Sequence, residues 1–74
     1  MISIKLRDDY IKLGQALKAA GLVSSGLDAK IAIQDGEVLV NGQQELQRGK
    51  KLVPGDKLRF GDEEILICAK DGKE

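Results

Sequence analysis

The chain has 74 residues, of which 42% are hydrophobic and 32% charged, and its twelve basic and twelve acidic residues cancel. A chain of this length forms one small domain that buries about 60% of the surface its unfolded form exposes, which leaves no room for a deep cavity. The balanced charge excludes a whole-molecule attraction to nucleic acid, although a local basic patch can still act over a screening length of roughly 8 Å. No apolar run approaches the ~20 residues of a membrane span, and the N-terminus lacks the apolar stretch of a signal peptide, so we expect a cytoplasmic protein without a membrane partner.

Missing residue types exclude most catalytic and metal chemistry. The chain has no histidine and one cysteine, Cys68, which we interpret as a small buried hydrophobe. An internal disulfide, a Cys/His zinc site and a nucleophile–histidine pair are therefore excluded. The consecutive carboxylates Asp8-Asp9 and Glu63-Glu64 would point to opposite faces of a strand, which makes them poor acid–base partners. The sequence predicts no enzyme, no cofactor, no metal and no small-molecule substrate.

The N-terminal third predicts a strand followed by a helix. Apolar and polar side chains alternate over residues 2–7, which is typical of a short half-buried strand. Asp8 or Asp9 suits the N-cap of a helix over residues 10–20, where apolar residues recur at helical spacing. Gly21 suits the end of that helix.

A second helix is predicted next, beginning after Ser24 or Ser25 and ending at Gly36. Its apolar residues fall on two sides, with Ala29, Ala32 and Ile33 on one and Leu27 and Ile31 on the other. A helix that is apolar on two sides is expected to be covered by the first helix on one side and by a sheet on the other. Lys30 and Gln34 would then emerge along one groove.

A hairpin signal follows the second helix. Residues 37–40 predict a strand, and Asn41-Gly42 predicts a tight turn because both residues tolerate positive φ. The next stretch, residues 43–53, is polar and basic, and it predicts an irregular connection with a short strand near residues 50–53.

The C-terminal third predicts a second hairpin. Pro54-Gly55 fits the centre of a type II turn, and strands are expected over residues 57–60 and 64–69. Residues 71–74 predict a disordered tail, so the single domain covers residues 1–70. The expected fold is α+β, with two N-terminal helices packed on a small, mostly antiparallel sheet of four or five strands.

The segment SGLDAKIAIQDGEVLVNG, followed by RGKKL and PGDKLRF, resembles the RNA-binding domain named after the fourth small-subunit ribosomal protein, also called the alpha-L motif. More narrowly, it is similar to small stand-alone bacterial members of the YbcJ and YaaA type, and the resemblance covers nearly the whole chain. It implies a non-catalytic domain that binds structured RNA, either ribosomal or transfer RNA. The residues carried over by position as RNA contacts are Ser25, Lys30, Gln34, Asn41, Gln43, Arg48, Lys50 and Lys51.

The order of the elements favours the same basic edge. Because the second helix runs directly into the strand at residues 37–40, the loop that follows should fold back beside the helix and bring Arg48 and Lys50 toward Lys30. Cations converging in this way suit adjacent backbone phosphates, although each could also be an ordinary solvated charge. The two aromatic residues, Tyr10 and Phe60, are expected in the core. Recognition should therefore depend on phosphates, 2′-hydroxyls and shape, which favours folded RNA over single strands.

Two other functions fit the same sequence. The VNG and PGD turns also suit a β-grasp-like carrier or interaction module, but a carrier needs a C-terminal diglycine and this chain ends in DGKE. A protein-interaction adaptor that uses Leu27, Ile31 and Leu39 would bind without the salt dependence of phosphate contacts. In each case we expect a monomer.

Overall fold

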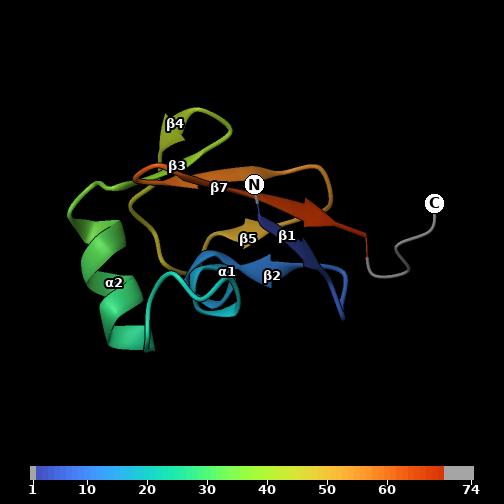
Figure 1. The fold of residues 1–74 in the computed structure, drawn as a ribbon, viewed down its shortest axis with the longest axis horizontal. Helices are drawn as coiled ribbons and strands as arrows, with labels where there is room; N and C mark the ends of the chain where they lie inside the picture. Colours follow the sequence, from blue (N-terminus) through green and yellow to red (C-terminus); the bar gives the residue numbers. More distant parts are fainter. Residues whose placement is uncertain (1, 70–74) are drawn as a thin grey trace.

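A five-stranded sheet with the order β1-β7-β6-β3-β4 forms one layer of the domain (Figure 1). The computed structural model describes residues 2–69, so the disordered tail expected at residues 71–74 lies outside the described residues. β1 and β7 are parallel, and the other neighbours are antiparallel. The strands are β1 (Ile2–Lys5), β3 (Val38–Val40), β4 (Gln43–Gln44), β6 (Lys57–Phe60) and β7 (Glu63–Cys68).

The two helices lie on one side of this sheet, next to a second, two-stranded sheet (Figure 1). The remaining elements are β2 (Ile11–Lys12), α1 (Leu13–Ala19), α2 (Gly26–Gln34) and β5 (Lys51–Leu52), with β2 antiparallel to β5. The expected α+β class and the mostly antiparallel sheet are confirmed. The expected order of elements is not confirmed. Residues 2–69 form seven strands in two sheets, and two strands precede the helices where one was predicted.

The first helix begins at Leu13, later than predicted, because the residues before it form β2. The Leu13 amide donates to the carbonyl oxygen of Lys50 at 2.9 Å, and the Gly14 amide donates to that of Arg48 at 3.1 Å. The first amides of a helix have no partner within the helix, and here a loop from the second half of the chain supplies it. The prediction of an aspartate N-cap was therefore wrong.

The second helix has the predicted ends but not the predicted surroundings. The Ser25 hydroxyl accepts a hydrogen bond from the Asp28 amide at 3.2 Å, which confirms the N-cap, and Gly36 ends the helix with a φ of 80°. Leu27 and Ile31 are 65% and 50% exposed, so the prediction that both apolar sides are covered was wrong. The physical reason is the small size of the domain. One side of α2 packs on α1, and the elements within residues 2–69 leave the side with Leu27 and Ile31 exposed.

The turn predictions are confirmed. Asn41 and Gly42 both have positive φ, 52° and 86°, and they join β3 to β4 in a two-residue hairpin. In the later turn the Asp56 amide donates to the carbonyl oxygen of Val53 at 3.0 Å, with Gly55 at a φ of 98°.

The core lies between the five-stranded sheet and the helices. Phe60 is half-buried against this core, but Tyr10 is 40% exposed and lies outside it, which corrects the expectation for Tyr10. Tyr10 precedes β2 and is not part of α1, so the helical spacing that placed it in the core does not apply. Cys68 is half-buried rather than buried. The largest fully buried side chains are Leu13, Leu17, Ile33, Val38, Leu52, Leu58, Ile65 and Ile67. Neither helix within residues 2–69 has the length and apolar character needed to cross a membrane.

Candidate nucleic-acid interface

The side chain of Arg48 lies across the start of α1, in space that Gly14 leaves open. A Cβ added at Gly14 would lie 2.7 Å from Arg48 Cγ, 3.3 Å from Arg48 Cδ and 3.7 Å from the Cβ of Ala29 on α2. The Arg48 stem therefore packs directly against the backbone of Gly14, where a side chain at position 14 would have to displace it. The hydrogen bond from the Gly14 amide to the Arg48 carbonyl oxygen fixes the backbone at the same point.

An open groove of about 310 Å³ lies beside this arginine, and we call it the α1–α2 groove. It is lined by Lys12, Gly14, Gln15, Lys18, Gly26, Arg48 and Gly49. Three of these residues are cations and none is a carboxylate. Within residues 2–69, neither lysine forms an ion pair, and nor does Arg48. Unpaired cations with donors beside them are the usual means of holding nucleic-acid phosphates.

Sequence reasoning predicted Arg48 but missed Lys12 and Lys18. On a helix of unknown orientation both lysines are indistinguishable from ordinary solvent-facing charges. The available signal was local charge, because residues 1–23 carry four basic and two acidic side chains, a net of +2. Only the crossing of α1 by the loop that carries Arg48 makes these lysines part of one site.

A second open groove, of about 280 Å³, brings together three of the predicted residues, and we call it the β3–β4 groove. Its lining includes Asn41, Gln43 and Lys50, together with Glu45 and Asp56. The Asn41 side chain is used within the fold, because its Nδ2 donates to Asp56 Oδ1 at 3.1 Å and its Oδ1 accepts from the Lys57 amide at 3.0 Å. Asn41 therefore holds the turn in place, and two carboxylates make this groove less positive than the α1–α2 groove.

The β3–β4 hairpin contacts the end of α2, but neither groove brings Lys30 together with Arg48 or Lys50, contrary to the prediction from the order of elements. Nε2 of Gln44 donates to the carbonyl oxygen of Gly36 at 3.0 Å, which ties β4 to the end of the helix. On α2 itself, Lys30 and Gln34 are exposed and follow Gly26 at intervals of four residues. Residues at this spacing share one helix face, so Lys30 and Gln34 extend from the α1–α2 groove along the helix.

The last two predicted residues, Ser25 and Lys51, do not line the α1–α2 groove but are neighbours of residues that do. Ser25 directly precedes Gly26, and its hydroxyl oxygen already accepts from the Asp28 amide. Lys51 is the register partner of Lys12 in the β2–β5 pair. Its Nζ lies 4.8 Å from the centroid of the Tyr10 ring, a cation–π distance. Of the predicted residues, one therefore lines the α1–α2 groove, three line the β3–β4 groove, two lie on one face of α2, and Ser25 and Lys51 lie outside these three sets.

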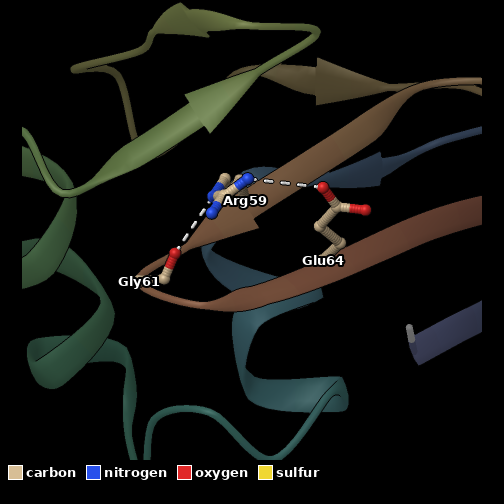
Figure 2. Close-up of polar contacts among 3 residues, drawn as sticks. All are labelled: Arg59, Gly61 and Glu64. Atoms are coloured by element: carbon tan, nitrogen blue, oxygen red, sulfur yellow. Dashed lines mark hydrogen bonds and ion pairs between the residues drawn. The ribbon is translucent and has the colours of Figure 1, made fainter.

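The outer face of the five-stranded sheet carries an arginine that is paired within residues 2–69, unlike the cations of the α1–α2 groove. Figure 2 shows Arg59 of β6 between two partners: Nε donates to the carbonyl oxygen of Gly61 at 3.1 Å, and Nη1 is 3.5 Å from Glu64 Oε2. Leu58, the next residue along β6, is buried in the core, so Arg59 and Lys57 face away from the helices. This face provides a matched set of positive charges outside the candidate interface.

Comparisons with known proteins find similar sequences over most of the chain. A family model described as the S4 domain matches residues 4–68. A protein of Bacillus subtilis (strain 168) with the name "Probable ribosome maturation protein RlbA" is 43% identical over 53 residues, which cover 72% of this chain and 75% of that protein. An Escherichia coli (strain K12) protein with the name "Putative RNA-binding protein YbcJ" is 35% identical over 60 residues, which cover 81% of this chain and 86% of the relative.

Proposed function

Because this chain belongs to the S4 domain family, we propose that it binds structured RNA, either ribosomal or transfer RNA, without catalysing a reaction. The observation that carries the proposal is the α1–α2 groove, where cations from β2, α1 and the loop before β5 converge in a lining without a carboxylate. The names of the two relatives, one referring to ribosome maturation and the other to RNA binding, support it. In this proposal the protein acts as a monomer in the cytoplasm.

In this proposal the cations bind phosphates and the polar side chains bind riboses. Lys30, Arg48, Lys50 and Lys51 contact phosphate oxygens, joined by Lys12 and Lys18 of the α1–α2 groove. Ser25, Gln34, Asn41 and Gln43 contact 2′-hydroxyls or phosphates. Asn41 keeps one Nδ2 hydrogen that can donate to either group, because only the other is used on Asp56, and the Ser25 hydroxyl likewise keeps its proton to donate. Such contacts read shape and backbone more than base sequence.

The proposal predicts a steep salt dependence of RNA affinity. Purified protein would be titrated into fluorescently labelled bulk ribosomal and transfer RNA, with anisotropy measured from about 50 to about 300 mM salt. If about four of these six cations contact phosphates at once, each with a slope of about 0.7–0.9, the association constant should fall by roughly 150- to 600-fold over this range. No binding at the lowest salt concentration would contradict the proposal.

A second prediction concerns Gly14, which carries no charge. Gly14→Ala would push the Arg48 stem away from the start of α1 and is expected to weaken RNA binding severalfold although the net charge is unchanged. The free energy of unfolding should change by less than about 2 kcal/mol, because overpacking costs ~1–3 kcal/mol and the gain in helix propensity offsets part of it. Urea unfolding and the same anisotropy titration measure the two effects.

The control for Gly14 is a double-mutant cycle. If Gly14→Ala acts through Arg48, it should have no further effect on RNA affinity when Arg48 is already alanine. An equal loss of affinity in both backgrounds would show that Gly14 acts in another way.

One observation favours a different function. Leu27 and Ile31 form an exposed apolar pair on the outer side of α2, as a protein-interaction adaptor would require. An adaptor of this kind would bind its partner with little salt dependence, so the RNA titration separates the two functions. The absence of RNA binding would favour the adaptor.

A further inference from the structure

Tyr10 lines an open crevice next to the α1–α2 groove. The crevice has a volume of about 320 Å³, and its lining includes the apolar residues Leu6 and Ile11 and the polar residues Arg7, Asp8 and Gln15. Tyr10 is 40% exposed and lies outside the hydrophobic core, and its hydroxyl has no hydrogen-bond partner within residues 2–69. The fold therefore leaves part of an aromatic ring open to solvent, outside the hydrophobic core.

We propose that this crevice binds one unpaired base of the RNA, stacked on the ring of Tyr10. The inference rests on the proposed function and names the feature of the RNA that would be recognised. A crevice of this size is at the lower end of the range for small-molecule sites, about 300–1,000 Å³, and suits a single base. Stacking on an exposed aromatic ring is the usual way in which proteins hold an unstacked base.

Gln15 connects this crevice to the phosphate-binding surface, because it lines both the crevice and the α1–α2 groove. A nucleotide with its phosphate beside Lys12 or Arg48 would thus have its base within reach of Tyr10. Oε1 of Gln15 already accepts from the Lys12 amide at 3.2 Å, which leaves its amide nitrogen to donate to a base.

The polar residues of the crevice supply both kinds of hydrogen-bonding group to a base edge. Asp8 offers carboxylate oxygens to an exocyclic amine, and Arg7 offers donors to a ring nitrogen or a carbonyl oxygen. Lys51 lies over the Tyr10 ring but does not line the crevice. The ring therefore has a cation on one side and an open crevice beside it, and Lys51 is placed to contact the phosphate next to a stacked base.

The test compares two RNA hairpins that differ in one base. One carries a single unpaired adenosine in its stem, and the other carries an abasic nucleotide at the same position, so both have the same backbone and charge. We expect the protein to bind the adenosine hairpin on the order of ten- to a hundredfold more tightly, as the loss of one stacked base implies. Tyr10→Leu should remove this preference, and Tyr10→Phe, which keeps the ring, should retain it.

The same comparison can be followed at Tyr10 itself. Because the chain has one tyrosine, protein labelled with fluorotyrosine gives one fluorine NMR resonance. This resonance should shift when the adenosine hairpin binds and should move much less with the abasic hairpin. Urea unfolding of Tyr10→Leu checks that the variant folds, as expected for a side chain outside the core.

The outcomes separate this inference from the proposed function. Equal, salt-dependent binding of both hairpins would overturn the base site and leave RNA binding standing. A preference for the adenosine hairpin that persists in Tyr10→Leu would also overturn it, since the base would then be held elsewhere. Failure of both hairpins to bind at low salt would overturn the inference together with the proposed function.

Discussion

Replacing Leu17 with alanine is expected to destabilise the domain by about 2–5 kcal/mol. Leu17 is fully buried where α1 meets the core, so the change loses the burial of its side chain and leaves a cavity that its neighbours fill only in part. In a domain of about 70–80 residues or fewer, the hydrophobic core rarely supplies more than about 3–5 kcal/mol of stability. The loss is therefore comparable with the whole free energy of unfolding, and a large fraction of the variant should be unfolded in buffer.

The matched control is Leu27→Ala on α2, which makes the same chemical change at a side chain that is 65% exposed. Surface changes of this kind usually alter stability by no more than about 0.5 kcal/mol. Urea unfolding followed by circular dichroism would measure both variants. Similar midpoints for the two would contradict the core described above, and a large loss in Leu27→Ala would mean that the outer side of α2 is covered in solution.

The features predicted correctly from the sequence are those fixed by local chemistry. Asn41-Gly42 and Pro54-Gly55 specify their turns because few other residues accept the backbone angles required. The N-cap at Ser25 is likewise fixed by its own hydroxyl and an amide three residues on. Each of these signals acts over at most four residues and can be recognised without knowing the rest of the fold. Together they mark the ends of the later helix and strands, so the order of these elements could be predicted.

The features that the sequence did not predict depend on pairings between distant segments. Ile11 pairs with Leu52 in the two-stranded sheet, and this pairing moves the start of α1 and takes Tyr10 out of the helical pattern. Local spacing carries no information on such a partner. The exposure of Ile31 has a similar origin, because an apolar pattern shows which sides of a helix can be buried but not which of them the rest of the chain reaches.

The candidate site shows the same division. The order of the elements predicted that the loop brings Arg48 and Lys50 toward Lys30, whereas the contact that the fold makes with the end of α2 is between Gln44 and Gly36. Lys12 and Lys18 join Arg48 only because Gly14 leaves room for the arginine stem across α1. The glycine at position 14, within a helical pattern, was the local sign of this crossing. The sequence around Gly14 does not reveal which segment of the chain packs against it.

The double variant Arg48→Ala with Lys50→Ala is expected to weaken RNA binding more than tenfold at low salt and to lower the slope of the logarithm of affinity against the logarithm of salt by roughly 1.4–1.8. Each lost phosphate contact removes a slope of about 0.7–0.9, the values for single strands and B-form duplexes. The backbone carbonyls of Arg48 and Lys50, which accept from the first amides of α1, are kept in the variant, so folding should be preserved.

The control that decides between a site and a general charge effect is Lys57→Ala with Arg59→Ala on the outer face of the sheet. It removes the same two charges, and its one ion pair, Arg59 with Glu64, is an exposed contact worth about 0–1 kcal/mol (Figure 2). If both double variants lost affinity equally, RNA would be responding to net charge rather than to this interface. An unchanged affinity in a well-folded Arg48/Lys50 variant would exclude these two residues from the interface. A loss confined to the Arg48/Lys50 variant is the expected result, because Arg48 and Lys50 lie where the loop meets the start of α1, whereas Lys57 and Arg59 lie on the outer face of the sheet.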